Sequence, residues 1–336
     1  MRVHILNLLF VLIIFLFSCN KKERKADISE IDMEINIQRL DQELFDVDFD
    51  TLNRHIAFVK KKYGAFFTLY TRNVINIGHP DNKAFPVYLK DFLTDEYINK
   101  AYNKVNEMYS DMSEEEETLE KAFKRYNYFF PDKKIPGIYT VISGFNESVF
   151  VSETSIGISL DKYLGKECVF YKRLGWPIYL INNMTREMIC RDVMHSWGLT
   201  EWEFSDSINN NVVNNMLYNG KIHYFVNKTL PGLPEHIVMG FTEDEMKFCR
   251  NNKEQMWTYL IEHKILFSTD YMDVRRYTSE SPFTPGFPNE SPGRAANWIG
   301  YHIIKSYMKN NPDVTVKQLM NDNNYQQILN ASKYKP

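Results

Sequence analysis

The stretch GIYTVISGFNESVFVSETSIGISL, residues 137–160, decides the fold class of this 336-residue chain. It holds three short runs of β-branched and aromatic residues, which Gly144, Asn146 and a few polar residues separate. Such runs between turn-forming residues are typical of strands. The stretch therefore predicts two or three adjacent strands joined by tight turns, forming a small sheet in the middle of the chain.

Helical patterns lie on both sides of this stretch. Residues 31–130 read as largely helical and aromatic, and apolar residues recur at helical spacing from about Thr185 to the C-terminus. We therefore predict an α+β fold that is mainly helical, with residues 31–336 forming a single large globular domain.

Capping residues predict where three helices begin. Ser113 and Thr242 each stand three residues before a glutamate, as in a capping box. Ser291 precedes Pro292, a favoured pair at the start of a helix. The segment 281–294 is rich in proline and glycine, so we expect a stiff, non-helical loop there.

The N-terminus has the pattern of a bacterial lipoprotein signal. Residues 5–17 form an apolar run that is too short to span a membrane and suits a signal-peptide core. Ser18 and Cys19 follow, a small residue before a cysteine. We predict that residues 1–18 are removed, that Cys19 carries lipid and holds the protein on a membrane, and that residues 19–30 form a tether. A plain secretory signal with a coincidental cysteine is the alternative.

Composition narrows the classes of partner. The formal net charge is −3 and there is no basic stripe, so we expect no nucleic-acid partner. Hydrophobic residues make up 44% of the chain and aromatic residues 15%, which suffices for a substantial core. Cysteines other than Cys19 lack the spacing of a metal site, and we predict buried thiols at Cys190 and Cys249 and no cofactor.

A degenerate metal motif lies within a helix predicted over residues 185–197. The stretch CRDVMHSW, residues 190–197, can be compared with the metallopeptidase motif H-E-x-x-H. Arg191 occupies the first histidine position, Asp192 the glutamate position and His195 the second histidine position. Residues four apart share a helix face, so we expect Arg191 and His195 to point the same way.

The position of a third metal ligand is altered as well. In one group of zinc peptidases of the zincin type, this ligand is a glutamate followed by glycine on the next helix. Here Asn219, followed by Gly220, stands at the corresponding position, 24 residues after His195. His223, His236 and His263 do not have the sequence spacing of metal ligands. With a small sheet ahead of the motif helix, the order of elements is like that of a zincin whose ligands have been replaced.

These replacements oppose zinc binding. Arg191 is a permanent cation, Asn219 is a weak neutral ligand, and Asp192 is one methylene shorter than a catalytic glutamate. His195 alone does not make a site of three protein ligands. We therefore expect no metal and no catalytic residue, with Arg191 in an ion pair that holds the former cleft together. The alternatives are a divergent zinc peptidase using His195 and Asp192, a peptide-binding pseudo-peptidase, and a stretch that never was a metal motif.

The stiff loop supplies a second candidate site. Glu290, Arg294 and Trp298 stand at its end and are candidate contacts for a protein partner. The alternative is that this loop is a rigid start to a helix and packs on the core.

Several stretches carry a resemblance to a known family. They are LDKYLG at 160–165, GFTEDEMKFC at 240–249, FSTD at 267–270, NESPGRAANWIGYHIIKSYM at 289–308 and NASKYKP at 330–336. Together with the signal that ends at Cys19, they resemble the gliding-motility lipoprotein GldB family of the Bacteroidetes, from about residue 30 to the end. That family is itself similar to exported zincin-like peptidases with a degenerate metal motif.

The resemblance implies a membrane-anchored accessory or scaffold protein of the cell envelope. It links the chain to gliding motility and the associated secretion machinery, with envelope proteins as partners, and it brings no established catalytic activity. The basic run CNKKERK, residues 19–25, lacks the acidic residues that often accompany surface export in these bacteria. We therefore expect the protein to face the periplasm.

Overall fold

The computed structural model describes residues 26–205 and 210–336 and has a mainly helical α+β fold, as predicted. Cys19, the signal segment 1–18 and the tether up to residue 25 lie outside the described residues. Within the described part, no helix combines the length and the apolar character needed to cross a bilayer.

The elements fall into three successive groups along the chain. The first group is β1 (Ile37–Arg39), α2 (Leu40–Phe45), α3 (Leu52–Leu69), α4 (Phe85–Thr94), α5 (Glu96–Met108) and α6 (Ser113–Phe129). The second is β2 (Gly137–Val141), β3 (Val149–Ser152), β4 (Ser155–Ser159), α7 (Val169–Arg173), α8 (Ile178–Ile181) and α9 (Ile189–Glu201). The third is α10 (Val212–Thr229), α11 (Glu235–Met239), α12 (Glu243–Asn251), α13 (Lys253–Glu262), α14 (Tyr271–Thr278), α15 (Ala295–Asn310), α16 (Val316–Asn321) and α17 (Tyr325–Ser332).

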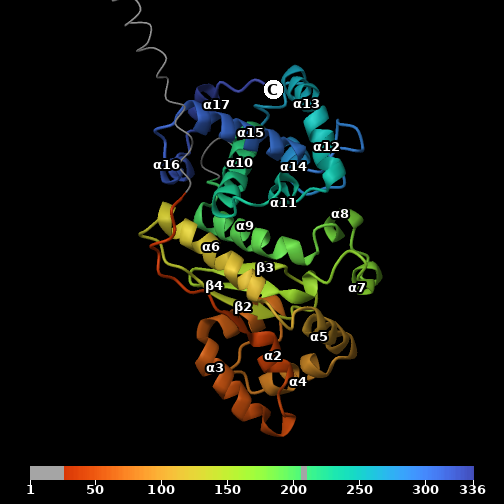
Figure 1. The fold of residues 1–336 in the computed structure, drawn as a ribbon. Helices are drawn as coiled ribbons and strands as arrows, with labels where there is room; N and C mark the ends of the chain where they lie inside the picture. Colours follow the sequence, from red (N-terminus) through yellow and green to blue (C-terminus); the bar gives the residue numbers. More distant parts are fainter. Residues whose placement is uncertain (1–25, 206–209) are drawn as a thin grey trace, which may run out of the picture.

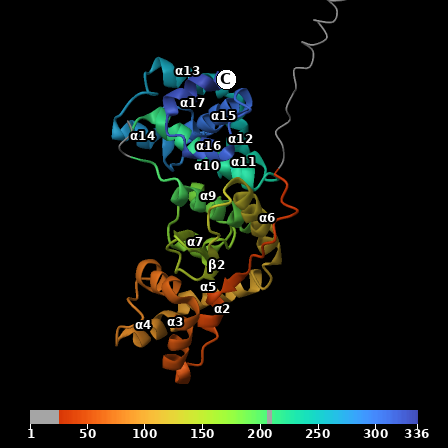
Figure 2. The ribbon, with the colours of Figure 1, turned by 90° about the vertical axis from the view of Figure 1, so that its left-hand side faces the viewer.

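These groups are stacked as layers. In Figure 1, α2, α3 and α4 lie below the sheet, α6 and α9 lie above it, and the helices from α10 onward form the top of the molecule. The view turned by 90° in Figure 2 shows the same succession, with α9 between the sheet and the C-terminal helices. The candidate motif helix therefore lies in the middle of the molecule.

The sheet has the strand order β1-β2-β4-β3. Strands β1, β2 and β4 are parallel, and β3 is antiparallel to β4. The prediction of adjacent strands within residues 137–160 is confirmed, although β2 pairs with β4 rather than with β3. Strand β1 was not predicted, because three residues are too few to show a periodic pattern.

Side chains alternate between the two faces of the sheet, as the period of a strand requires. Ile138, Ile156 and Ile158 belong to the upper core, which also contains residues of α6, α9 and α10. Val141 belongs to the lower core formed with α2, α3 and α4. Both faces are therefore buried, so the sheet separates two packed layers of helices.

Aromatic rings join the lower face of the sheet to α3. Phe66 of α3 stacks on Tyr139 of β2 at a centroid distance of 4.1 Å and on Phe150 of β3 at 5.6 Å. A Cβ atom at Gly157 of β4 would lie 2.1 Å from the Phe150 ring. Glycine is needed at this position so that the ring can lie flat across the neighbouring strand.

Helices α10 and α15 cross with their backbones in direct contact. A Cβ added at Gly300 would lie 1.9 Å from the Met216 carbonyl oxygen, and one added at Gly220 would lie 2.5 Å from the Gly300 carbonyl carbon. Gly220, which follows the predicted third-ligand position, therefore serves helix packing.

The capping predictions had different outcomes. Thr242 and Glu245 form the predicted capping box at the start of α12. Helix α6 begins at Ser113 without a side-chain cap, and the Glu116 carboxylate instead accepts a hydrogen bond from the Ile37 backbone nitrogen at 2.8 Å. The glutamate is thus used to fix β1 to α6, so the capping box predicted there was wrong.

The predicted cap at Ser291 was also wrong. Helix α15 begins only at Ala295, after Arg294 in a left-handed conformation, whereas the Ser291 hydroxyl accepts a hydrogen bond from the Thr284 nitrogen at 3.2 Å. The serine therefore fixes the preceding loop onto itself. The loop 281–294 is non-helical, as predicted.

All three described cysteines are free thiols. Cys168 and Cys249 are buried, whereas Cys190 is partly buried. The prediction of a buried thiol is therefore confirmed for Cys249, and Cys190 is more exposed than expected.

Candidate functional site

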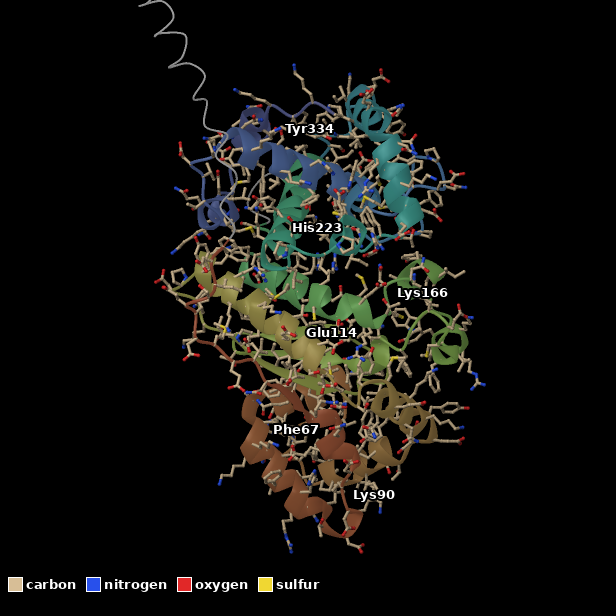
Figure 3. All side chains as sticks on the ribbon, viewed as in Figure 1. Phe67, Lys90, Glu114, Lys166, His223 and Tyr334 are labelled. Carbon is tan, nitrogen blue, oxygen red and sulfur yellow. The ribbon has the colours of Figure 1, made fainter. Side chains whose placement is uncertain are left out.

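Arg191, Asp192 and His195 all lie on α9, within the helix predicted for them. This helix contacts β3 and β4 on one side and α10 on the other. Figure 3 shows His223 of α10 just above α9. The degenerate motif is therefore enclosed between the sheet and the C-terminal helices.

Arg191 is directed at the C-terminal end of α11. Its side chain is 7% exposed, its Nε donates to the Val238 carbonyl oxygen at 3.1 Å, and its Nη1 donates to Asp192 Oδ1 at 2.8 Å. The last carbonyl groups of a helix have no partners within the helix and carry partial negative charge, so a cation stabilises them. The predicted ion pair of Arg191 is present, and its partner is the neighbouring Asp192.

A second buried arginine binds the same helix end. Arg294 Nη1 donates to the Met239 carbonyl oxygen at 2.9 Å, and its Nε lies 2.8 Å from Glu280 Oε1. Asn183 Nδ2 donates to the Gly240 carbonyl oxygen at 2.9 Å. Gly240 ends α11 in a left-handed conformation, with φ of 66°. Side chains from three separate segments thus satisfy the carbonyl groups at the end of α11.

Both oxygens of the Asp192 carboxylate accept hydrogen bonds. Oδ1 accepts from Arg191, and Oδ2 accepts from the Tyr163 hydroxyl at 2.9 Å. Burial and the Asp192 charge raise the pKa of Tyr163 well above its usual range, which keeps the phenol protonated as the donor. The two bonds therefore fix the orientation of the Asp192 carboxylate.

His195 and His223 face each other across α9 and α10. Their ring centroids are 5.3 Å apart, and His223 Nδ1 lies 3.1 Å from the Val238 carbonyl oxygen, which makes Nδ1 the protonated nitrogen. Burial, with Arg191 and Arg294 nearby, lowers the pKa of both imidazoles well below the usual value. The cluster thus holds two charged arginines and two neutral histidines.

These lowered pKa values predict a loss of stability in weak acid. An imidazole with a lowered folded-state pKa binds fewer protons in the folded than in the unfolded state, so stability falls as the pH drops below the unfolded value of 6.5. Each histidine contributes a slope of up to about 1.4 kcal/mol per pH unit. We expect the free energy of unfolding in urea to fall between about pH 6.5 and pH 5, with His223 contributing more because His195 retains some exposure.

Glutamine variants separate the contributions of His195 and His223 to this pH dependence from those of other histidines. The pKa of His302 is also lowered, chiefly by burial, so the wild-type slope contains its contribution. His223→Gln and His195→Gln should each flatten the slope. An unchanged slope in His223→Gln would contradict the assignment of a neutral buried imidazole.

Asn219 forms its side-chain hydrogen bond within its own helix and not with this cluster. Its Nδ2 donates to the Asn215 carbonyl oxygen of the same helix at 2.9 Å. His223, one turn further along α10, is the residue that lies beside His195. In residues 26–205 and 210–336, no three His, Cys, Asp or Glu side chains are grouped so that they could hold a metal ion.

The three residues suggested as docking contacts differ in exposure. Glu290 is exposed, whereas Arg294 and Trp298 are 8% and 1% exposed. Arg294 is part of the buried cluster at the end of α11, and Trp298 packs in the core beside His302. The surface role predicted for Arg294 and Trp298 therefore does not fit the structure, because α15 starts against the core.

Comparison with known proteins identifies the family. A protein-family model described as "Gliding motility protein GldB" matches residues 21–336. The chain belongs to the GldB gliding-motility lipoprotein family. Family membership implies a lipid anchor in the cell envelope. No curated protein and no solved structure matches the chain.

Three of the segments that carry the family resemblance meet at the arginine cluster. Tyr163 comes from the stretch 160–165, Gly240 from 240–249 and Arg294 from 289–308. Tyr163 donates to Asp192, and Arg294 binds the carbonyl groups of Met239 and Gly240. These distant stretches therefore have one structural task in common, the enclosure of α9 and α11.

Asp161 has a separate task in the first of these stretches. It is fully buried, and its carboxylate accepts hydrogen bonds from the backbone nitrogens of Ser143 and Phe145 at 3.0 and 2.6 Å. It thereby fixes the turn that leaves β2. The stretch 160–165 thus joins the sheet to the candidate site.

Proposed function

We propose that this chain is a non-catalytic accessory or scaffold lipoprotein of the cell envelope. It serves gliding motility and its associated secretion machinery, is anchored through lipid on Cys19, faces the periplasm and binds other envelope proteins. The observation that carries this proposal is the use of Arg191, where a zinc peptidase has a ligand, to hold the end of α11.

The charges of the cluster support a role without a metal. Arg191 and Arg294 are close enough to contribute to the lowered pKa values of His195 and His223. The positive charges of these two arginines also disfavour a divalent cation between the imidazoles, because like charges repel more strongly in a buried site. A zinc peptidase that uses His195 and Asp192 would also have to break the bonds of Asp192 to Arg191 and Tyr163.

A peptide-binding pseudo-peptidase is the second candidate function. It is favoured by a polar pocket of about 370 Å³ beside the end of α11. Asn183, which binds the Gly240 carbonyl oxygen, lines this pocket. This role is compatible with a scaffold, because binding a peptide segment does not require cleavage.

Two variants in the source bacterium test the anchored, non-catalytic role. We expect His195→Gln, placed at the chromosomal locus, to preserve secretion and colony spreading, since the proposal gives this imidazole no chemical role. Cys19→Ser should remove the protein from the membrane fraction and abolish both functions, because a protein without its acyl chains is not held on a membrane.

Protein levels must be matched in this experiment by immunoblotting. A His195→Gln strain that resembles the gene deletion at the wild-type protein level would contradict a non-catalytic role. Full retention of Cys19→Ser in washed membranes would contradict the lipid anchor.

A further inference from the structure

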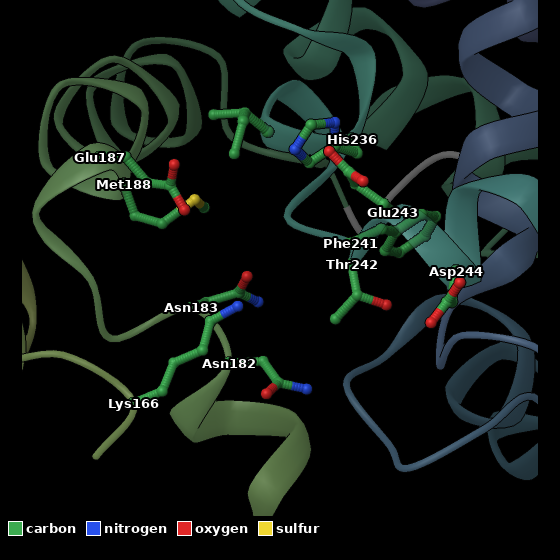
Figure 4. Close-up of a pocket in the computed structure, with 11 residues that line it drawn as sticks. Lys166, Asn182, Asn183, Glu187, Met188, His236, Phe241, Thr242, Glu243 and Asp244 are labelled. Carbon is green, nitrogen blue, oxygen red and sulfur yellow. The ribbon is translucent and has the colours of Figure 1, made fainter. Parts of the chain in front are cut away.

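Residues 166–183 form a lobe at the edge of the molecule, which we call the α7–α8 lobe. The residues that flank it are joined, because the Gly165 backbone nitrogen donates to the Met184 carbonyl oxygen at 2.9 Å. Figure 1 shows α7 and α8 at the right-hand edge of the molecule. Figure 4 shows Lys166 and Asn182, near the two ends of the lobe, on the same wall of the polar pocket. The lobe therefore starts and ends at one place on the body.

Buried side chains fix the lobe to the core. Phe170 and Tyr171 are buried, and the Tyr171 hydroxyl donates to the Asp161 carbonyl oxygen at 2.9 Å. Lys162 Nζ lies 3.5 Å from the centroid of the Trp176 ring, a cation–π contact that holds the indole. These contacts set the position of the lobe, so its outward side chains are free for another task.

The outward side of the lobe is apolar. Val169, Leu174 and Ile178 are 52%, 55% and 78% exposed. Single exposed apolar side chains are common, but these three lie within ten residues, and Ile178 is the most exposed large apolar side chain of the described residues. Apolar side chains that gather in this way on a protein surface mark a site of interaction.

The lobe is basic, although the chain as a whole is acidic. It carries Lys166, Lys172 and Arg173 against Glu167, whereas the formal net charge of the whole chain is −3. All three cations are exposed, and Lys172 pairs with Glu167 at 3.0 Å. Long basic side chains can lay their stems along apolar groups and keep their charged ends in a polar layer. Exposed aliphatic groups among such cations match the surface of a bilayer that contains anionic lipids.

The family of the chain favours a lipid surface over a protein as the occupant of the lobe. The lipid anchor that membership in the GldB lipoprotein family implies keeps the chain beside a membrane. Tryptophan and tyrosine are enriched where head groups meet acyl chains. Trp176 and Tyr179, both partly buried, stand on either side of Ile178 in the sequence. The lobe therefore has the residue types of an interfacial membrane contact.

We propose that the α7–α8 lobe is a second membrane contact of this protein. Leu174 and Ile178 enter the interface of a bilayer that contains anionic lipid, and Lys172 and Arg173 bind its phosphate groups. This inference rests on the lipid anchor of the proposed function and deepens it. An anchor on a tether allows many orientations of the protein, whereas a second contact fixes which surfaces face away from the membrane.

Quenching of tryptophan fluorescence by lipids with brominated acyl chains tests this contact. The full-length lipoprotein is reconstituted into vesicles of phosphatidylcholine alone, or of equal parts of phosphatidylcholine and anionic phosphatidylglycerol. The signal of the lobe is the part of the quenching that Trp176→Phe removes, since the chain has four other tryptophans. We expect this signal in the anionic vesicles and expect it to be at least about twofold smaller in the neutral ones.

Variants with a matched control separate the lobe from general contact with lipid. Ile178→Asp should lower the quenching at least about threefold, because a charged group at this depth is unfavourable. Ile261→Asp is the control, because Ile261 is 49% exposed near the end of α13 and should leave the quenching unchanged. Replacing both Lys172 and Arg173 by glutamine should remove the difference between anionic and neutral vesicles.

Several outcomes would overturn the proposal. Equal quenching of the wild type and Trp176→Phe in anionic vesicles is one, and equal effects of Ile178→Asp and Ile261→Asp are another. If Trp176→Phe does not fold, the comparison of these two aspartate variants decides. A lobe that is shielded from brominated lipid but crosslinks to another protein is a protein contact, which also contradicts the proposal. Flotation with the vesicles reports the lipid anchor separately, so flotation without quenching would refute the lobe contact and leave the anchor intact.

Discussion

Replacing Gly300 by alanine is expected to lower the free energy of unfolding by about 3 kcal/mol or more, at the upper end of the cost of overpacking. The added Cβ would lie 1.9 Å from the Met216 carbonyl oxygen, a backbone atom that cannot rotate away. Relief requires that α15 and α10, which pack closely against each other, move apart. Urea unfolding followed by circular dichroism measures the loss.

Gly232→Ala is the matched control for this experiment. Gly232 is exposed, and a Cβ placed there would have no atom within 4 Å. We expect its stability to lie within about 0.5 kcal/mol of the wild-type value. Equal stability of Gly300→Ala and Gly232→Ala would show that α10 and α15 do not pack in this way.

Replacing Arg191 by methionine is expected to lower the free energy of unfolding by about 3 kcal/mol. The substitution keeps much of the side-chain volume but leaves Asp192 with only Tyr163 as a partner and removes the hydrogen bond to the Val238 carbonyl oxygen. Breaking a buried pair by removing one partner leaves a buried charge without compensation. The same urea titration measures this effect.

A second substitution and an exposed pair control the Arg191 experiment. Asp192→Asn in the Arg191→Met background should recover part of the loss, because it removes the uncompensated charge. Arg276→Met breaks an exposed pair with Asp273, for which we expect a cost of no more than about 1 kcal/mol. A cost for Arg191→Met as small as that of Arg276→Met would indicate that Arg191 is not a structural part of the cluster.

Strong local patterns predicted the main elements of the fold. The stretch 137–160 gave three strands, because its β-branched runs are separated by turn residues. The order of strands could not be predicted, since β4 lies between β2 and β3 through pairing that no local pattern specifies. The predicted capping box at the start of α6 was wrong because Glu116 bonds to a residue far away in the sequence, the backbone nitrogen of Ile37.

The candidate site was predicted only in part. Helical spacing placed Arg191, Asp192 and His195 on one helix, and an ion pair of Arg191 was expected. His223 was missed because its contact with His195 depends on how α10 packs on α9. Arg294 was assigned to the surface because a proline-rich loop precedes it, whereas the start of α15 turns its side chain toward α11.

The central claim is that α9 carries the altered remains of a metal motif and that the protein works without zinc. Metal analysis of the full chain, purified in detergent without chelators or affinity metals, tests this claim most directly. The account predicts far less than one zinc per chain in the wild type and in His195→Gln alike. One tightly held zinc per chain in the wild type, lost in His195→Gln, would contradict it.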